Sequence, residues 1–479
     1  MTSSTFCVHG HFYQPAREDP LTGEIPLESG ASPFHDWNEL IYDHCYRPNA
    51  ELGNFERISF NIGPTLFEWM RIHYPQTCNQ IIAQENRNME RFGVGNGMAQ
   101  AYHHTILPLA SRVDKITEVR CGIVDFQNRF GHAPNGMWLP ETAVDLETLE
   151  VMVDCGIQFT ILAPWQAKTE SLDITQPYWV DLPGKKRIAV FFYQPELSTR
   201  ISFDPESTMD ATKFFKEILI PQFHGLLAKD GSKFLLMASD GELYGHHQKF
   251  RDKFLAHLTQ LSLNTDLSQP GYPGRWLQEH QPVHSMRIIS NTSWSCHHGV
   301  TRWMGHCGCT PHGEWKAHLR QAFNMLADAI DAIYLSEMQK WTDDPWELRH
   351  QYIHVLLGLK KLDDLLKAQI HQDLSDHDIR KVDMLLSAQH ERQRMFTSCG
   401  WFFEDFDRIE PRNVVAYAAQ AVWLTYLATG KDLIPQAMNW LRPVESWVSG
   451  LRGDVVFAER IQLTQKYFEK MLPPVWIPG

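Results

Sequence analysis

The chain has 479 residues, 43% of them hydrophobic and 21% charged, which is enough for two or three folded units and shows no bias toward disorder. Its 57 acidic residues outnumber the 44 basic ones, and the formal net charge of −13 argues against binding to a nucleic-acid backbone. No segment approaches the roughly 20 apolar residues of a membrane span, the N-terminus lacks the pattern of a secretory signal, and the nine cysteines are scattered. We therefore expect a cytoplasmic protein with reduced thiols and neither a membrane nor a nucleic-acid partner.

Short apolar runs alternate with helical patterns over the first half of the chain, which predicts repeated βα units and an α/β fold. The expected strands are Phe6–His9, Ile58–Ile62, Phe92–Asn96, Gly136–Trp138, Phe159–Leu162, Ile188–Phe192 and Phe234–Ala238. Polar side chains lie near the ends of several strands, the position of active-site residues in a βα barrel. An open, doubly wound sheet would give a similar alternation.

Helical periodicity predominates in the last third of the chain. The expected helices are Trp315–Met338, Asp344–Gln369, His377–Arg394, Val414–Thr429 and Arg460–Met471. We therefore expect a barrel domain over residues 1–285, a loop and junction rich in Cys, His and Trp over residues 286–313, and a C-terminal helical domain over residues 314–479.

Two segments carry histidines at positions where a ligand could bind. The segment VHGHFYQP places His9, His11 and Gln14 after the first strand, and AYHHTILPL contains His103. Imidazole and amide groups suit hydrogen bonds to sugar hydroxyls, and imidazole also binds metals. The alternatives are ordinary polar loop residues and, for His103, a solvent-facing or helix-capping histidine.

Two carboxylates follow different predicted strands on the same predicted face. Glu141 lies behind Trp138 in GMWLPETAVDLETL, and Asp240 lies two residues before Glu242 in LLMASDGELYGHH. A first-turn helical acid would explain Glu147 better than Glu141, because Glu141 precedes the helix. Asp240 and Glu242 could form an ordinary turn or bind a metal together. Cleavage of a glycosidic bond needs two opposed carboxyl groups, and Glu141 with Asp240 is the candidate pair.

The segment SWSCHHGVTRWMGHCGCTPHGEW is dense in cysteine and histidine. We interpret it as a substrate-facing loop with Trp294 or Trp303 as a stacking surface and His298 as a substrate contact. The alternative is structural zinc, although the spacing is not that of a standard zinc finger. Its ligands would be Cys296, Cys307, Cys309 and His312.

Taken together, these stretches resemble glycoside hydrolase family 57. HGHFYQP, YHHTILPL, GMWLPE and SDGELYGHH are similar to that family's four motifs, and they occur in the family's order. The later WSCHHGVTRWMGHCGC and MFTSCGWFFED resemble a subgroup with a DUF3536-type C-terminal region. The chain departs from the motifs in two places: Phe12 and Tyr13 precede Gln14, and His104 stands where the second motif has proline.

The resemblance implies an incomplete (β/α)7 barrel followed by a helical domain, and a retaining double displacement on α-glucans without a cofactor or a catalytic metal. The reaction would be hydrolysis, 4-α-glucanotransfer or branching, with an α-glucan or oligosaccharide as substrate. Glu141 would be the nucleophile and Asp240 the acid/base. The residues expected to bind the substrate are His9, His11, Gln14, His103, Trp138, Glu242, Trp294, His298 and Trp303.

Two other functions remain open from the residues alone. A metal-dependent deacetylase or mannosidase would bring His9, His11, His103 and Asp240 within roughly 2.0–2.2 Å of one ion. A non-catalytic glucan-binding protein would retain an aromatic groove without turnover. The retaining enzyme predicts that the carboxyl groups of Glu141 and Asp240 lie roughly 5–5.5 Å apart.

Overall fold

The computed structural model describes residues 4–227, 231–263 and 265–471. The chain divides into two compact units that are interleaved in the sequence. The α/β unit comprises Met1–Ala16, Leu27–Tyr102 and Asp125–Trp294, and the helical unit comprises Arg17–Pro26, His103–Val124 and Ser295–Gly479. Domain boundaries at residues 285 and 313 therefore remain a proposal. Residues 1–3, 228–230 and 264 of the expected barrel and 472–479 of the expected helical domain lie outside the described residues.

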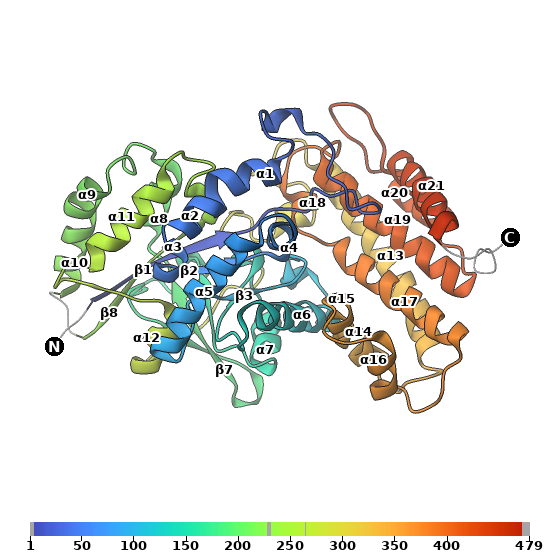
Figure 1. The fold of residues 1–479 in the computed structure, drawn as a ribbon, viewed down its shortest axis with the longest axis horizontal. Coiled ribbons are helices and arrows are strands. Elements are labelled where there is room, and N and C mark those ends of the chain that lie inside the picture. Colours follow the sequence, from blue (N-terminus) through green and yellow to red (C-terminus); the bar gives the residue numbers. More distant parts are fainter. Residues whose placement is uncertain (1–3, 228–230, 264, 472–479) are drawn as a thin grey trace. The chain divides into compact units, whose positions relative to one another are not determined.

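The α/β unit is built around parallel strands (Figure 1). The strands are β1 (Ser4–Phe12), β2 (Ser59–Ile62), β3 (Ala99–Gln100), β4 (Met137–Trp138), β5 (Phe159–Leu162), β6 (Tyr178–Asp181), β7 (Arg187–Phe192), β8 (Lys233–Asp240), β9 (Gln269–Pro270) and β10 (Ser285–Met286). Within the part of the chain that the structure describes, seven of them form a parallel row in the order β8-β1-β2-β3-β4-β5-β7.

Ladders join most neighbours in this row, and two isolated bridges complete it. Phe60 of β2 pairs with Gly97 just before β3, and Gly136 just before β4 pairs with Phe159 of β5. Beyond the end of β7, the backbone N–H of Gln194 donates a hydrogen bond of 2.7 Å to the carbonyl of Leu236 on β8. The segment that follows β7, at one end of the row, is thus hydrogen-bonded to β8, at the other end.

Six of the seven expected strands are confirmed, and Phe92–Asn96 is wrong. Phe92 ends helix α5 (Pro75–Phe92), and Gly93 caps that helix in the left-handed region at φ 69°. Val94 is nevertheless buried in the core, which explains why its apolar pattern resembled a strand. The sequence also missed β6, which pairs antiparallel with β7.

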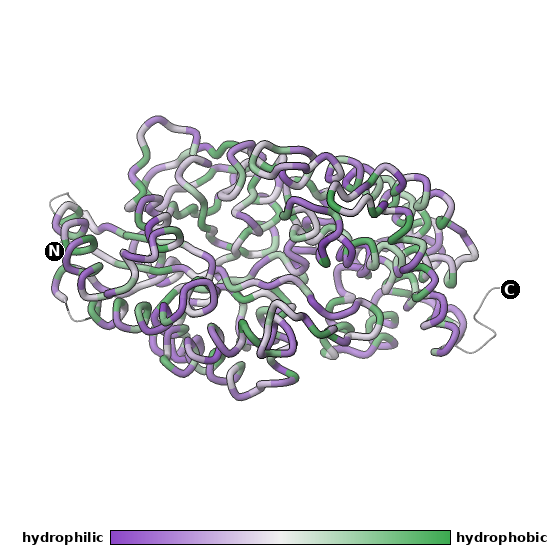
Figure 2. The backbone as a smooth tube through the Cα atoms, turned by 90° about the horizontal axis from the view of Figure 1, so that it is seen from above, coloured by the Kyte–Doolittle hydropathy of each residue, from purple (hydrophilic) through white to green (hydrophobic). Residues whose placement is uncertain are grey.

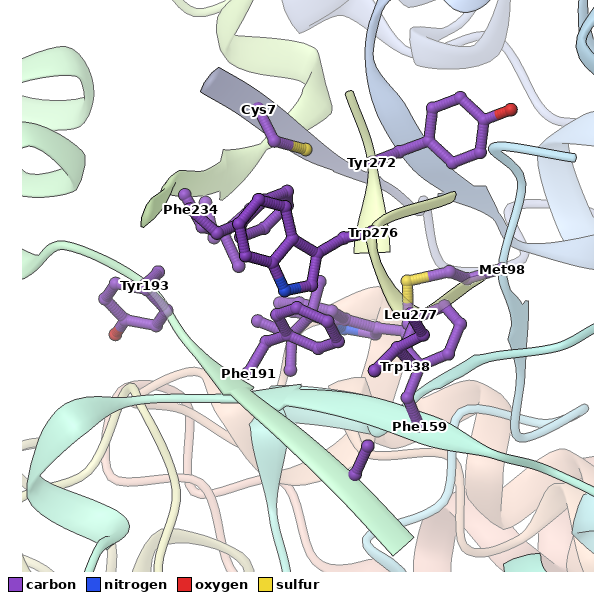
Figure 3. Close-up of a cluster of buried hydrophobic side chains, with 14 of the residues drawn as sticks. Cys7, Met98, Trp138, Phe159, Phe191, Tyr193, Phe234, Tyr272, Trp276 and Leu277 are labelled. Carbon is purple, nitrogen blue, oxygen red and sulfur yellow. The ribbon is translucent and has the colours of Figure 1, made fainter. Parts of the chain in front are cut away.

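Aromatic side chains from several strands form the core of this unit. Figure 3 shows Trp138 of β4, Phe159 of β5, Phe191 of β7 and Phe234 of β8 around Trp276 of helix α12 (Pro273–Glu279). Each ring removes about 150–250 Å² from water, so this cluster provides a large share of the hydrophobic stabilisation of the unit. Trp138 of this cluster also stacks on the imidazoles of His9 and His11.

Helices connect these strands along the chain. Besides α5 and α12 they are α1 (Trp37–Ile41), α2 (Arg47–Glu51), α3 (Asn54–Arg57), α4 (Pro64–His73), α7 (Leu146–Asp154), α8 (Pro195–Phe203), α9 (Ala211–Phe214), α10 (Ile220–Leu227) and α11 (Arg251–Leu263). Helix α6 (Arg112–Phe130) carries the chain from the helical unit to the α/β unit.

The helical unit packs long helices against one another (Figure 1). They are α13 (Glu314–Met338), α14 (Pro345–Gln351), α15 (Ile353–Leu356), α16 (Leu362–Gln369), α17 (Asp376–Arg394), α18 (Cys399–Phe402), α19 (Ile409–Thr429), α20 (Ile434–Leu441) and α21 (Gly453–Met471). Helix α19 is buried along most of its length and contacts both α17 and α21. The single helix expected over Asp344–Gln369 is instead three, and Gly358 adopts a left-handed φ of 68° between the last two.

Hydrophilic and hydrophobic residues alternate along the chain (Figure 2). Among the described residues, no helix combines the length and the apolar character that crossing a bilayer requires. Most apolar side chains of the helices are instead buried in the protein.

Candidate active site

Three polar residues lie at the same level on neighbouring strands of the α/β unit. In the parallel ladders, His11 of β1 is paired with Asn61 of β2 on one side and with Asp240 of β8 on the other. Side chains alternate along a strand, so His9 shares the face of His11. The strand register therefore places a carboxylate, an amide and two imidazoles near the carboxyl ends of three strands.

Asn61 connects the two buried histidines. His9 donates from Nε2 to Asn61 Oδ1 at 3.2 Å and accepts a hydrogen bond from the hydroxyl of Ser59 at its Nδ1, 3.0 Å away. The amide nitrogen of Asn61 donates to His11 Nδ1 at 2.9 Å and to Gln100 Oε1 at 2.7 Å. This pattern is consistent with one neutral tautomer for both histidines.

Electrostatics also favour neutral imidazoles. Burial is the main cause that lowers the pKa of His9 to about 3, with the neighbouring His11 as a second cause. Burial likewise lowers the pKa of His11 to about 4, although the hydrogen bond that the charged ring can donate to Asn61 Oδ1, 3.2 Å from its Nδ1, opposes the shift. Both side chains are therefore hydrogen-bonding groups rather than cations at neutral pH.

The indole of Trp138 lies between the two histidines and Trp294. It stacks on His9 with ring centroids 4.6 Å apart and on His11 at 5.2 Å, and it meets Trp294 edge to face at 5.0 Å. Trp138 is fully buried, whereas Trp294 is half-buried. In this conformation Trp294, not Trp138, can present an aromatic surface to a ligand.

Glu141 occupies a strained turn directly after β4. Its φ is 58° and that of Thr142 is 49°, a region that residues other than glycine enter at a cost. Trp294 holds Glu141 twice: its backbone N–H donates to the carbonyl of Glu141 at 3.0 Å, and its indole Nε1–H donates to the carboxylate Oε2 at 3.1 Å. The donor fixes the direction of the carboxylate.

Gln166 stabilises the same turn through hydrogen bonds to Thr142. Its Nε2 donates to the carbonyl of Thr142 at 2.8 Å and to that of Thr292 at 3.1 Å, and its Oε1 accepts from the hydroxyl of Thr142 at 2.9 Å. Gln166 is fully buried. One amide therefore joins the turn that carries Glu141 to the segment that leads to Trp294.

Asp240 ends β8 and is accessible to water. Desolvation by the surrounding protein is the first cause that raises the pKa of Asp240 to about 7, and the negative charge of Glu141 is the second. A carboxylate responds in this way when a second carboxylate lies within direct Coulomb range. The two candidate carboxyl groups are thus electrostatically coupled, and Asp240 is the one that retains a proton near neutral pH.

Glu242 lies deeper than its expected role as a substrate contact suggests. It is 2% exposed, and Tyr46 donates a hydrogen bond of 2.7 Å to its Oε1. Burial is the main cause that raises the pKa of Glu242 to about 8, while the hydrogen bonds from Tyr46 and Gln14 oppose this shift. The carboxyl group is therefore largely protonated at neutral pH and touches protein atoms instead of solvent.

The remaining expected site residues belong to the helical unit. His103 Nδ1 lies 2.8 Å from Glu118 Oε1, and its ring is 5.0 Å from that of His390. Trp303 is fully buried, so it presents no surface to a sugar in this conformation. His298 lies beside cysteines, with Nδ1 3.2 Å from Cys307 Sγ.

Three residues of the arrangement were given no role from the sequence. Asn61 lies near the carboxyl end of the expected strand Ile58–Ile62, and that position was the available signal. Tyr46 and Gln166 lie far in sequence from Glu242 and Glu141, and only the tertiary fold brings them together.

Comparisons with known proteins identify related sequences and structures. An α-amylase from Pyrococcus abyssi is 21% identical over 213 residues, which are 43% of this chain and 30% of the relative. A 4-α-glucanotransferase from Thermococcus litoralis is 22% identical over 214 residues, again 43% and 30%. The aligned region thus covers about a third of the length of these curated relatives.

A solved structure shows the same fold over nearly the whole chain. It is that of an exo-type maltose-forming amylase from Pyrococcus sp. ST04, with a TM-score of 0.73 at 13% identity, covering 98% of this chain and 93% of that one. Residues 312–472 match a domain of unknown function, DUF3536. The family model of glycosyl hydrolase family 57 matches residues 20–282, more than half of the chain, and the chain therefore belongs to glycosyl hydrolase family 57.

Proposed function

We propose that this protein cleaves α-linked glucans with retention of configuration, by a double displacement in which Glu141 is the nucleophile and Asp240 the acid/base. The observation that carries the proposal is the pairing of an oriented carboxylate with an accessible carboxyl group whose pKa is raised to about 7, in part by the charge of the first. Two carboxyl groups with different proton affinities are what this reaction requires. The strand row is taken as an incomplete (β/α)7 barrel with the site at its carboxyl ends.

In the first step, Asp240 gives its proton to the glycosidic oxygen while the carboxylate of Glu141 attacks the anomeric carbon. The glycosidic C–O bond breaks, and the sugar becomes an ester of Glu141. In the second step, Asp240, now ionised, takes a proton from a water molecule or a sugar hydroxyl as that oxygen attacks the anomeric carbon. The ester bond breaks, and both carboxyl groups return to their starting states.

The neutral histidines suit binding of an uncharged sugar. His11 accepts from Asn61 at Nδ1, so in the neutral tautomer it carries its proton at Nε2, where it can donate to a hydroxyl oxygen. Trp294 offers part of its ring to the apolar face of a sugar. Gln14, His9, Trp138 and Glu242 would act mainly by holding these groups in place. The contribution of His103 is a separate proposal that substitution would test.

The metal-dependent deacetylase alternative gains no support from the donor groups. His9 and His11 direct ring nitrogens at the side chain of Asn61. Within the described residues, the His, Cys, Asp and Glu side chains that converge with ligand geometry are those of a different cluster, in the helical unit. None of the nine cysteines, all of which lie in the described residues, is paired in a disulfide, which is compatible with the proposal of a cytoplasmic location.

Product analysis tests the proposed function. The wild-type protein would be incubated with maltooligosaccharides and with amylose, alongside Glu141→Gln and a control, Glu147→Gln, in the first turn of α7. Loss of the nucleophile should lower turnover by at least about 10³-fold, whereas the control should retain it. Shorter free sugars would indicate hydrolysis, longer chains transfer, and new branch points branching. Equal activity of wild type and Glu141→Gln would exclude the mechanism.

A further inference from the structure

Four potential metal ligands converge in the helical unit. The Sγ atoms of Cys296, Cys307 and Cys309 and a ring nitrogen of His298 all lie within 4.8 Å of one another. Cys296 Sγ is 3.4 Å from Cys307 Sγ, and His298 Nδ1 is 3.2 Å from Cys307 Sγ and 3.4 Å from Cys309 Sγ. A disulfide would bring two sulfurs to about 2.05 Å, so this cluster is not a disulfide.

These separations match the edges of a small tetrahedron. A zinc ion with Zn–S bonds of about 2.3 Å and a Zn–N bond of about 2.0 Å holds two sulfurs about 3.8 Å apart and a sulfur and a nitrogen about 3.5 Å apart. The three distances given above are shorter than these values by at most a few tenths of an ångström, and the other three separations do not exceed 4.8 Å. One ion can therefore reach all four atoms after a small adjustment of the side chains.

Two tight turns supply the ligands in pairs. Cys296 and His298 belong to one turn, in which the N–H of Gly299 donates to the carbonyl of Cys296 at 3.1 Å. Cys307 and Cys309 belong to the other, in which the N–H of Thr310 donates to the carbonyl of Cys307 at 2.9 Å. The N–H of Cys309 also points at Cys307 Sγ, 3.5 Å away, a contact that stabilises a thiolate.

A buried lysine provides an independent indication of negative charge at this place. Lys316, on α13, is fully buried, and its Nζ has no hydrogen-bond partner among the described residues. The charges that act on its ammonium group are, in order, those of Arg302, Cys307, Glu404 and Cys296, so two of its three anionic neighbours are thiolates of the cluster. Three thiolates and one Zn²⁺ carry a net charge of −1, which the ammonium would neutralise. Without such a partner, a buried ammonium is costly.

We propose that Cys296, His298, Cys307 and Cys309 bind a structural Zn²⁺ ion. Soft thiolates with one imidazole select zinc over the hard cations, and four protein ligands leave no open position for a substrate. The sequence had suggested His312 as the fourth ligand, but the histidine in the cluster is His298. The ring of His312 instead stacks on Trp447, with centroids 4.1 Å apart. His298 is thereby assigned to the metal and not to the substrate.

The ion would fix a segment that matters for the candidate active site. Only Ser295 separates Trp294, which holds Glu141, from the first ligand, Cys296. Zinc would tie the turn after Trp294 to a second turn eleven residues further on. The proposal itself is independent of the reaction, because it concerns ligands that the reaction does not use.

Metal analysis of the full chain, purified without chelators, tests the proposal. The wild type should contain about one zinc per chain, and Cys307→Ser and His298→Ala should lose most of it. The matched controls His312→Ala and Cys399→Ser should retain it, since His312 lies outside the cluster and Cys399 is a partly buried cysteine elsewhere in the same unit. Circular dichroism would show whether each variant is folded.

A second measurement does not depend on the variants folding. Wild-type protein stripped with a chelator and given Co²⁺ should develop the visible bands of tetrahedral cobalt with thiolate ligands, and its melting temperature should rise when Zn²⁺ is returned. Three results would overturn the proposal: wild-type protein that neither contains zinc nor takes up Co²⁺, a Cys296–Cys307 disulfide in unreduced peptides, or zinc that is lost from His312→Ala but kept by His298→Ala.

Discussion

At the scale of single residues, Glu141 and Asp240 differ in what surrounds them. Glu141 accepts an indole N–H from Trp294, which stabilises a negative charge on its carboxylate. Desolvation and the charge of Glu141 together raise the pKa of Asp240 to about 7. These surroundings suit Glu141 to the role of nucleophile and Asp240 to the role of acid.

Asp240→Asn should impair cleavage of substrates whose leaving group needs a proton and spare the first step on substrates whose leaving group does not. Without the acid, cleavage of maltooligosaccharides should fall by about 10³-fold, because the departing sugar hydroxyl needs a proton. A 4-nitrophenyl α-maltoside needs no such proton, so the variant should still form the glycosyl-enzyme, seen as a burst of nitrophenol. Glu141→Gln should lose activity on both substrates. Equal losses on both substrates for Asp240→Asn would contradict its role as the acid.

The pH dependence follows from the raised pKa of Asp240. Its protonated form is the active one in the first step, so kcat/KM should level off about one pH unit below 7, be half of that level near pH 7, and fall about tenfold per pH unit well above it. The folded state holds this proton after an unfolded chain has released it, so its stabilising contribution is lost as the pH rises from about 4 through 7. Asp240→Asn should therefore melt at a higher temperature than the wild type at pH 8, with little difference at pH 4. An alkaline limb centred near pH 4 would contradict the assignment.

Trp294→Phe should remove one hydrogen bond while keeping an aromatic ring beside Trp138. The indole N–H bonds to a charged group, a bond typically worth about 1.5–3 kcal/mol, so kcat should fall by roughly 10- to 100-fold. KM should change much less, because the ring surface is retained. Parallel measurement of Trp165→Phe, whose indole donates to the carbonyl of Ser293, provides a control for loss of an indole donor near the site. A kcat for Trp294→Phe equal to that of the wild type would show that the donor does not orient Glu141.

At the scale of elements, patterns within one strand or helix were predictable and partners across the fold were not. The strand endings at Asp240 and before Glu141 could be located because apolar runs mark buried strands. Tyr46 and Gln166 gave no comparable signal, since their roles depend on which distant group they meet. Asn61 could be placed near a strand end, but its bonds to the two histidines could not be anticipated. The zinc ligands illustrate the same limit: the density of cysteine and histidine identified the segment, but only the tertiary structure distinguishes His298 from His312.

A buried charge network joins α6, α13 and α17 of the helical unit. Arg392 donates from Nη1 to Asp114 Oδ2 at 2.7 Å and from Nη2 to Asp331 Oδ2 at 2.6 Å. Burial alone would raise the pKa of Asp114, but the charges of Arg392 and Arg349 outweigh it and hold the pKa well below its usual range. The folded-state stabilisation from Asp114 is therefore present above about pH 4 and is lost as the pH falls.

Arg392→Met should destabilise the helical unit strongly. It leaves two carboxylates without their shared counter-ion, a change that typically costs about 3–5 kcal/mol when the pair is buried. The control is Arg412→Met, which removes a partly exposed pair with Asp407 and should cost at most about 1 kcal/mol. Urea unfolding followed by circular dichroism measures both, and the gap between the variants should narrow at low pH. Similar midpoints for the two variants would exclude a stabilising role for the network.

At the scale of the whole molecule, the sequence indicated an α/β region followed by helices but not how the chain is shared between the two units. Residues 17–26 and 103–124 belong to the helical unit although their neighbours in sequence belong to the α/β unit. Local periodicity carries no information about such interleaving, because a helix has the same pattern whichever unit it packs against. His103 illustrates the consequence, since it follows a strand of one unit and lies in the other.

The account as a whole depends on a covalent intermediate at Glu141. The most direct measurement is mass spectrometry of protein incubated with a 5-fluoro-α-maltosyl fluoride, which forms the glycosyl-enzyme quickly and releases it slowly. The account predicts a mass increase of one fluoromaltosyl group and its location on the peptide that contains Glu141, with no adduct on Glu141→Gln. An adduct on Asp240, or steady turnover of a natural glucan with inverted configuration and no adduct, would contradict it.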